Sequence, residues 1–339
     1  MKHYKKFCVR ALPVYAAQYW YTGDMEALPR LTDGSVRLEP LFVHRCNAGV
    51  TVYYESSLVD DGPQHLFEYY RDNPHKLDAL TEEYRRIAQE NPKYLSEATI
   101  EHIREVFDLN AHFVFPFTTI IYQLGNQDRE DLREVATVAK NTRHWDDKVI
   151  YGPGFRLYDL ISEKFSLPIP EWPAYVTIEE ALHHTAPHVD VIHERKANWV
   201  YHQGMLHGGI HDIDAFLYEK DVTLEKEVVD TNQHELRGRV AHGGTATGLV
   251  RIVRTFNDME DFQEGEILVS PMTSPDFTPV IHKALAIVTD EGGVTCHAAI
   301  VSRELQIPCI VGTRVATHVL RNSDRIEVNM RRGIVTRLQ

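Results

Sequence analysis

A short loop with two glycines, followed by a histidine, is the part of this sequence best suited to chemistry. Gly292 and Gly293 precede Thr295 and His297, and the apolar run 284–288 comes just before them. The run is typical of a buried strand, and the residues from His297 onward are typical of a short amphipathic helix. Glycines let backbone N–H groups approach an anion, and a helix N-terminus favours negative charge. The pattern predicts a phosphate cradle that presents an imidazole, which is itself a phosphate acceptor.

This segment resembles the phosphohistidine signature of the phosphoenolpyruvate-utilising enzymes, among them phosphoenolpyruvate synthase, pyruvate phosphate dikinase, enzyme I of the sugar phosphotransferase system and rifampin phosphotransferase. Residues 265–269 and 273–277 resemble the family's "GD-I-LV … T-x-P-D-aromatic" run, and residues 306–313 resemble its "G-I-P-x-V-V-G-T". Residues 236–250 resemble its glycine-rich entry hairpin. The likeness covers roughly residues 232–339, which is far more specific than one short motif. It is closest to the synthase and rifampin-phosphotransferase branch.

Two positions depart from the family pattern. Residues 322–324 read Asn-Ser-Asp where the family has Asp-Gly-Asp, and Gln306 stands where it has glycine. Both lie away from the histidine, so they affect loops rather than the chemistry.

The resemblance implies an α/β swivelling phosphohistidine domain at the C-terminus. It makes His297 the catalytic residue, with a side chain that we expect to be at least partly exposed. Gly292, Gly293 and Thr295 are expected to hydrogen-bond the phosphate. Arg303 is a further candidate for phosphate binding, but it follows His297 by about two helical turns, so structural pairing is its alternative.

The composition indicates a globular chain with uneven charge. It has 339 residues, 43% of them hydrophobic, and a formal net charge of −13. From residue 232 onward there are 12 basic and 12 acidic residues, so the excess of negative charge lies before that point. An acidic surface of this kind disfavours nucleic acid and anionic membranes as partners. Four scattered cysteines without a CxxC pair, no signal peptide and no long apolar run predict a cytoplasmic protein.

The residues before the carrier segment predict a mostly α-helical domain over 1–218. Apolar residues recur at three-to-four spacing from residue 65 to 140, while 8–12 and 50–54 suggest strands and 60–63 suggests a turn. Thr177 and Glu180 have the spacing of a capping box. Residues 219–236 are charged and poor in apolar side chains, which predicts a hinge or linker before the α/β domain at 237–339.

A histidine-rich segment, residues 183–211, lies just before the predicted linker. Its spacings match no recognised zinc pattern, so no metal site is predicted. Surface or structural roles are one interpretation of these histidines, and acid–base chemistry on an acceptor is another. For the second, His207 and His211 are the candidates, because they flank a Gly-Gly loop near the linker. Arg195 is a candidate for binding an anionic acceptor, with a surface salt bridge as its alternative.

The resemblance implies a phosphotransferase component that carries a phosphoryl group on His297 from a donor to a small-molecule acceptor held by the helical domain. The sequence has no Walker A loop and no pattern of an ATP-grasp domain or TIM barrel. We therefore expect one part of a split enzyme, with no tightly bound cofactor, whose donor is ATP with Mg²⁺ on a separate ATP-grasp protein rather than phosphoenolpyruvate. Two alternatives remain: a non-catalytic binding or regulatory homologue, and a secondary-metabolism enzyme that phosphorylates its acceptor before dehydration or condensation.

Overall fold

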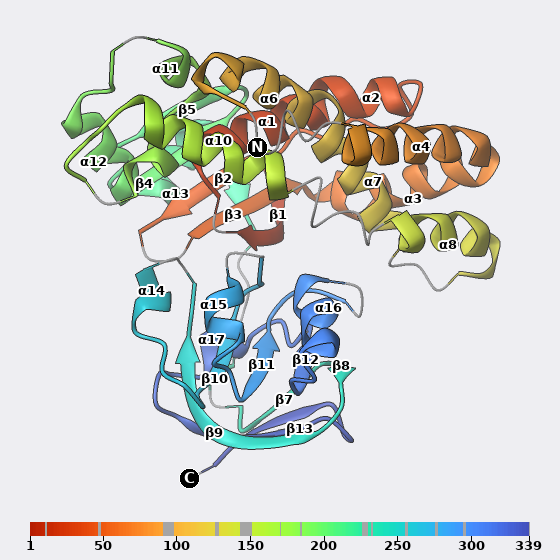
Figure 1. The fold of residues 1–339 in the computed structure, drawn as a ribbon, viewed down its shortest axis with the longest axis vertical. Coiled ribbons are helices and arrows are strands. Elements are labelled where there is room, and N and C mark those ends of the chain that lie inside the picture. Colours follow the sequence, from red (N-terminus) through yellow and green to blue (C-terminus); the bar gives the residue numbers. More distant parts are fainter. Residues whose placement is uncertain are drawn as a thin grey trace. The chain divides into compact units, whose positions relative to one another are not determined.

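The computed structural model describes residues 1–10, 12–46, 49–90, 98–125, 129–142, 151–169, 171–183, 185–225, 230–231, 233–254, 257–274, 277–293 and 296–338. The chain divides into two compact units (Figure 1). Unit 1 comprises Met1–Phe7, Leu12–Cys46 and Val50–Glu225, and unit 2 comprises Cys8–Ala11, Asn47–Gly49 and Lys226–Gln339. No helix among the described residues is both long and apolar enough to cross a lipid bilayer.

Unit 1 is built around a six-stranded sheet with the strand order β5-β4-β2-β3-β1-β6. The central pairs β2·β4 and β4·β5 are antiparallel, whereas β1 and β6 pair in parallel. The strands are β1 Lys2–Arg10, β2 Leu41–Arg45, β3 Gly49–Glu55, β4 Asn198–His202, β5 Met205–Gly208 and β6 Val222–Leu224.

Helices account for the rest of the regular structure in unit 1. The α-helices are α1 Val14–Thr22, α2 Leu28–Leu31, α3 Ser56–Asp72, α4 Pro74–Glu90, α6 Ile103–Leu109, α7 Phe115–Gly125, α8 Arg133–Thr142, α10 Tyr151–Lys164, α11 Ile178–Leu182, α12 Val189–Ala197 and α13 Ile213–Glu219. Among the described residues, η1 Gly23–Ala27 and η3 Asn110–Val114 are π-helical turns, and η2 Ile100–His102, η4 Glu130–Leu132 and η6 Trp172–Tyr175 are 3₁₀ turns.

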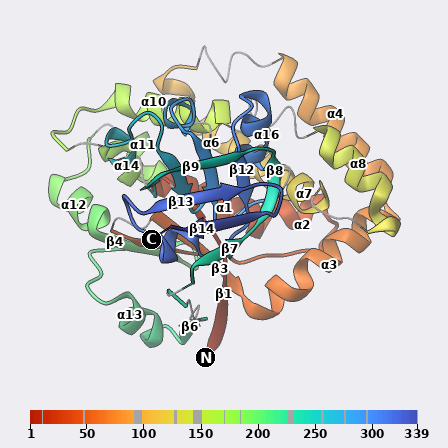
Figure 2. The same cartoon turned by 90° about the horizontal axis from the view of Figure 1, so that it is seen from below.

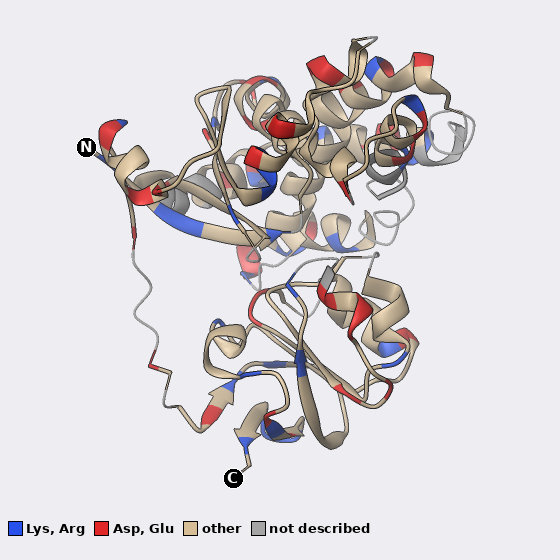
Figure 3. Cartoon of the chain, turned by 90° about the vertical axis from the view of Figure 1, so that its left-hand side faces the viewer, with Lys and Arg blue, Asp and Glu red and all other residues tan. Residues whose placement is uncertain are grey.

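Apolar cores formed by the described residues hold unit 1 together. Helices α3, α4, α7 and α8 lie side by side and bury large side chains such as Tyr70, Tyr84 and Phe117 (Figures 1 and 2). A second core between the sheet and α13 contains Val43, Val200 and Leu217. The description as mostly helical is therefore incomplete, because six strands form a sheet within this unit. Acidic side chains are spread over its helices (Figure 3).

Unit 2 contains an eight-stranded sheet with the order β7-β14-β13-β9-β10-β11-β12-β8. Strands β9 to β12 run parallel, and the strands on either side of them pair antiparallel. The strands are β7 Glu235–Arg237, β8 Arg239–His242, β9 Thr245–Ile252, β10 Ile267–Ser270, β11 Ala286–Thr289, β12 Cys309–Val311, β13 Arg325–Asn329 and β14 Ile334–Arg337. The helices are α14 Asn257–Glu260, α15 Thr278–Ile281, α16 His297–Glu304 and α17 Ala316–Val319.

The parallel strands of unit 2 are buried on both faces. In β10, Ile267 and Val269 belong to one core together with residues of α17, whereas Leu268 belongs to a second core with residues of α15 and α16. This alternation is the period of a strand, and it explains why the strand sequences are apolar throughout. Mixed α/β content in the C-terminal region is thereby confirmed.

Two expectations about the chain around unit 2 need correction. Residues 236–250 do not form a hairpin, because β8 pairs with β12 and β9 pairs with β13 and β10. Gly238 crosses the end of β12 so closely that a Cβ on it would lie 2.7 Å from the carbonyl oxygen of Val311. The predicted linker 219–236 is also too long, since β6 pairs with β1 and β7 pairs with β14. Of the segment between them, residues 226–229 and 232 lie outside the described residues.

Candidate functional site

His297 is the first residue of α16, and the loop that carries it begins at the carboxyl end of β11. The helix packs beside β12 and β8 within unit 2 (Figure 1). Its first turn is held down by apolar contacts, because Cys296, Ala298 and Ala299 all belong to the core on that side of the sheet. The sequence therefore folds locally as strand, glycine loop and helix N-terminus, the arrangement that favours anions.

The imidazole of His297 is buried, with only 8% of the residue exposed. The expectation of a partly exposed side chain is thus wrong, because the start of α16 is anchored in the core. The Nδ1 atom is hydrogen-bonded to the hydroxyl of Thr273 at 3.0 Å. Burial lowers the pKa of His297 to about 4, so the imidazole is neutral near pH 7. A neutral imidazole is the nucleophilic form of histidine.

The loop before His297 has a backbone that only glycine suits. Gly292 has a φ of +107°, and a Cβ placed on it would lie 2.8 Å from Sγ of Cys296. The carbonyl of Gly293 accepts a hydrogen bond from the Cys296 amide at 3.0 Å, which closes the turn into α16. Thr295 lies outside the described residues. The phosphate contacts of these residues stay a prediction.

A buried carboxylate fixes the start of the same loop. Asp290 accepts hydrogen bonds from the Thr313 hydroxyl at 3.2 Å and from the Thr317 amide at 3.1 Å, and also from the Thr317 hydroxyl. Burial raises the pKa of Asp290, and the bonds from Thr317 act against that rise. Asp290 thereby ties the ends of β11 and β12 to the first turn of α17.

Sequence reasoning missed the roles of Asp290 and Thr273. Each of these two residues nevertheless had a local signal in the sequence. Asp290 stands between a buried strand and two glycines, where a charged side chain must find partners. Thr273 opens the run 273–277, which comes directly after the neighbouring parallel strand, and carboxyl ends of parallel strands meet at one edge of a sheet.

Arg303 lies in the last turn of α16, at the opposite end of the helix from His297. Its Nε donates a hydrogen bond to the carbonyl of Ala241 in β8 at 3.1 Å. This contact gives Arg303 a structural role between α16 and β8, the alternative that the sequence had left open.

The three candidates for an acceptor site in unit 1 have different surroundings. Arg195 donates to both carboxylate oxygens of Glu180 at 2.6 and 2.9 Å and to the carbonyl of Tyr175 at 2.8 Å. Glu180 and Thr177 form the predicted capping box of α11, so Arg195 has a structural role. The ring of His207 lies 5.0 Å from that of Phe216, and burial lowers its pKa. His211 is exposed on the segment that follows β5. Arg195 packs against β5, the strand of His207, because a Cβ on Gly208 would lie 3.2 Å from Cγ of Arg195.

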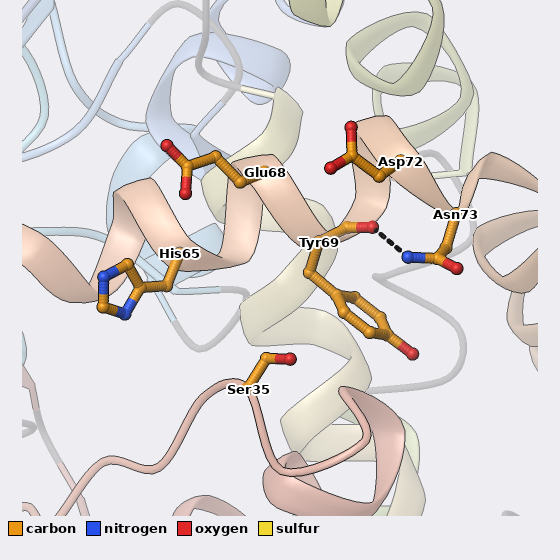
Figure 4. Close-up of a pocket in the computed structure, with 6 residues that line it drawn as sticks. All are labelled: Ser35, His65, Glu68, Tyr69, Asp72 and Asn73. Carbon is orange, nitrogen blue, oxygen red and sulfur yellow. Dashed lines mark hydrogen bonds between the residues drawn. The ribbon is translucent and has the colours of Figure 1, made fainter.

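One pocket of unit 1 lies on the exposed side of α3 and contains none of the predicted site residues (Figure 4). His65, Glu68 and Asp72 of α3 line it together with Ser35, Tyr69 and Asn73. In Figure 4 the Tyr69 ring lies on the side of α3 near Ser35, whereas the carboxylates of Glu68 and Asp72 point the other way. Their helical spacing could have identified this polar face from the sequence. Its two carboxylates make it unsuited to an anionic acceptor. Within the described residues, no group of three or more His, Cys, Asp or Glu side chains is placed to hold a metal ion.

Comparison with known proteins identifies the region around His297. Residues 262–333 match the family model described as "PEP-utilising enzyme, mobile domain". A probable phosphoenolpyruvate synthase of Methanothermobacter thermautotrophicus is 47% identical over 111 residues, which is 33% of this chain and 16% of that protein. A probable phosphoenolpyruvate synthase of Archaeoglobus fulgidus is 50% identical over 100 residues, 30% of this chain and 13% of that protein.

The phosphoenolpyruvate synthase of Pyrococcus furiosus is 44% identical over 119 residues, 35% of this chain and 15% of that protein. The matches thus span less than a fifth of the length of these curated relatives. They bear on the C-terminal region alone, and they agree with the resemblance found in the sequence. Residues 262–333 are thus similar to the mobile domain of phosphoenolpyruvate-utilising enzymes.

Proposed function

We propose that the chain is a phosphotransferase component in which unit 2 carries a phosphoryl group on His297. The observation that supports this most strongly is the state of the imidazole: it is buried and neutral, it stands at a helix N-terminus, and Thr273 holds its Nδ1. Because Nδ1 is engaged by that hydroxyl, Nε2 is the atom assigned to attack. The mobile-domain match supports the same role.

The chemistry is a double displacement. Nε2 of His297 forms a bond to phosphorus, the bond from phosphorus to the donor's leaving oxygen breaks, and that oxygen keeps the electron pair. In the second step, a hydroxyl oxygen of the acceptor bonds to phosphorus and the N–P bond breaks. The backbone around Gly292 and Gly293 and the N-terminus of α16 stabilise charge on the phosphate oxygens.

The donor in this proposal is ATP, bound with Mg²⁺ on a separate ATP-grasp protein, and phosphoenolpyruvate is the second candidate. Mg²⁺ on that partner would neutralise charge on the phosphates of the nucleotide. The acceptor is a small molecule bound by unit 1. Travel between the two sites requires unit 2 to move on the segment between β6 and β7.

The test is phosphate incorporation into the full chain. The chain is incubated with Mg²⁺, clarified extract of the source cells and either ATP or phosphoenolpyruvate, and the intact mass and an acid-labile, base-stable label are measured. The proposal expects one phosphate, lost completely in His297→Ala and retained in His282→Ala, an exposed histidine of the same unit.

The outcomes separate the alternatives. An undiminished label in His297→Ala would refute the assignment of the carrier residue. If only phosphoenolpyruvate gives a label, it is the donor in place of ATP, and His297 is still the carrier residue. No label from either donor would favour the non-catalytic homologue. A phosphorylated acceptor that goes on to lose phosphate would favour the secondary-metabolism enzyme.

A further inference from the structure

Unit 1 buries a histidine whose ring nitrogen has no hydrogen-bond partner in the described protein. His202, the last residue of β4, is 5% exposed, and its Nε2 makes no hydrogen bond among the described residues. A buried polar atom without a hydrogen-bond partner destabilises the fold, so it calls for an explanation. His202 lies in the histidine-rich segment, but the sequence pointed to His207 and His211 instead.

The end of the sheet at which His202 stands gathers further polar side chains. The register pairs the start of β1 with the start of β6, and the end of β4 with the start of β5. Figure 2 shows β6 and the N-terminal end of β1 near α13. The ring of Tyr4 meets His202 edge-on, with centroids 6.4 Å apart. Nearby, Nζ of Lys2 lies 3.8 Å from a carboxylate oxygen of Glu39 and 3.2 Å from one of Glu55.

A tight turn and a second tyrosine complete this group. The turn between β4 and β5 has positive φ at Gln203 and Gly204, and a Cβ on Gly204 would lie 3.6 Å from the ring of Tyr21. Tyr21 hydrogen-bonds Glu39, and its ring is edge-on to that of Tyr201 at 5.5 Å. All of these residues belong to unit 1.

The group contains neutral buried side chains, His202 and Tyr4, and charged side chains that are more exposed, Lys2, Glu39 and Glu55. Burial lowers the pKa of His202, with Glu39 acting against that and His207, Lys2 and Lys220 acting with it. Burial, followed by Glu39, Glu55 and Tyr21, raises the pKa of Tyr4 to about 12. Near pH 7, the imidazole of His202 and the phenol of Tyr4 are therefore both uncharged. The charged groups around them are the ammonium of Lys2 and the carboxylates of Glu39 and Glu55.

The uncharged imidazole of His202 and phenol of Tyr4 suit a hydroxyl group better than a charged one. In neutral imidazole one nitrogen donates and the other accepts, so Nε2 needs either a donor or an acceptor according to the tautomer. A hydroxyl serves as both. A carboxylate or phosphate would be repelled by Glu39 and Glu55, with Lys2 and Lys220 acting against that repulsion, and it would lose its hydration.

We propose that this end of the sheet binds an uncharged, hydroxyl-bearing small molecule whose hydroxyl hydrogen-bonds Nε2 of His202. Taken together with the proposed function, this molecule is the phosphoryl acceptor. Its hydroxyl oxygen bonds to phosphorus, the N–P bond to His297 breaks with its electron pair returning to that imidazole, and the proton passes to Nε2 of His202. His202 is then the base of the second transfer step.

Binding is tested without any phosphate. The full chain, labelled with ¹⁵N-histidine, is titrated with glycerol and with myo-inositol, and in parallel with acetate and inorganic phosphate, while the histidine ring nitrogens are followed by NMR. The His202 signals are those absent from His202→Gln. The proposal expects a saturable shift of these signals with a polyol, a weaker affinity in Tyr4→Phe, and an unchanged affinity in His193→Gln, an exposed histidine on α12.

Other results would overturn it. A shift with the anions alone would refute the class of ligand. Signals that no polyol moves would mean that water alone serves Nε2. If His202→Gln fails to fold, Tyr4→Phe supplies the comparison. The polyol should bind His297→Ala as it binds the unmodified chain, so a failure of the carrier chemistry would leave the binding result standing. If the polyol binds but does not discharge the phosphorylated chain, the base role of His202 is wrong.

Discussion

The two units satisfy their buried polar groups in different ways. In the described part of unit 2, each buried carboxylate, imidazole or hydroxyl has a partner within the unit, as Asp290 has in Thr313 and Thr317 and His297 has in Thr273. In unit 1, Oδ1 of Asp24 and Nε2 of His202 are buried without one among the described residues. Buried polar side chains of unit 2 hold the loop before His297 in place, whereas unit 1 keeps polar atoms that no described residue satisfies.

Asp24 shows the difference most clearly. It lies in the π-helical turn η1 and is fully buried, and its Oδ2 accepts hydrogen bonds from Trp20 Nε1 at 3.0 Å and from the Tyr54 hydroxyl at 2.6 Å. Burial raises its pKa to about 7, although the bonds from Tyr54 and Trp20 act to lower it. Unit 1 thus contains a carboxyl group that is partly protonated near neutral pH.

The largest effect is expected from Asp24→Asn. The carboxyl pKa is 3.8 when solvated and about 7 in the fold, so the folded state binds the proton more tightly. Wild-type stability should fall as pH rises from about 4 to about 7, by roughly 4 kcal/mol, and then stay level. The asparagine variant should lack that decrease and be more stable than wild type at about pH 8.

Urea unfolding followed by far-UV circular dichroism at about pH 5 and pH 8 measures this. Asp33→Asn is the control, because Lys76 and then Tyr69 lower the pKa of that exposed carboxyl. Asp33→Asn should act in the opposite direction: if this variant is less stable than wild type, the difference should appear at about pH 8. Equal pH dependence in Asp24→Asn and wild type would show that Asp24 is ionised and paired, and the contrast between the units would disappear.

The next effect is expected on the carrier itself. Thr273→Val removes the hydroxyl bound to Nδ1 of His297 without changing the volume of the side chain much. We expect the rate of phosphate incorporation to fall about 100-fold, because the imidazole loses the group that sets its orientation and tautomer. Thr273→Ser should recover most of the rate. A valine variant at the wild-type rate would show that Thr273 only fills space.

A smaller loss of stability is expected from Asp290→Asn. The amide turns one acceptor oxygen into a donor that faces the Thr317 amide, which should cost about 2 kcal/mol. Thermal unfolding of the full chain measures this, and Glu327→Gln, a change on the partly exposed side of β13, should leave the midpoint unaltered. An unchanged midpoint in Asp290→Asn would mean that the loop before His297 does not depend on this network.

The smallest effect is expected from Arg195→Lys. A lysine cannot reproduce both hydrogen bonds to Glu180, so unit 1 should lose about 1 kcal/mol of stability. Discharge of the phosphorylated chain by the polyol should be unchanged. The reverse result, full stability with weaker acceptor affinity, would restore Arg195 to the acceptor site.

The sequence predicted the structure best where residues close together in the chain determine the local backbone conformation. The run 284–288, the two glycines and His297 correspond to β11, its loop and the start of α16, and Thr177 with Glu180 forms the expected capping box. Each of these depends on neighbours a few residues away. Contacts such as the hydrogen bond between Thr273 and His297 depend on parallel strands meeting at one edge, which local spacing does not encode.

The sheet of unit 1 could not be predicted in the same way. Strand β2 pairs with β4, whose residues lie some 150 positions later in the chain, and β4 is buried on both faces, so it has no alternating pattern. The turn predicted at 60–63 is wrong, because α3 runs through these residues. Large side chains farther along α3, among them Phe67 and Tyr70, pack into the helical core, and such packing overrides local propensity.

The pairing of β7 with β14 has a consequence for how unit 2 can be combined with other proteins. These are the first and last strands of the unit's sheet, and they lie hydrogen-bonded side by side, with Leu236 opposite Val335. A domain whose entry and exit strands are neighbours can be inserted into a surface loop of a host without stretching either junction. The segment from β7 to β14 is therefore suited to insertion at different places in a polypeptide, with the loop before His297 left unchanged.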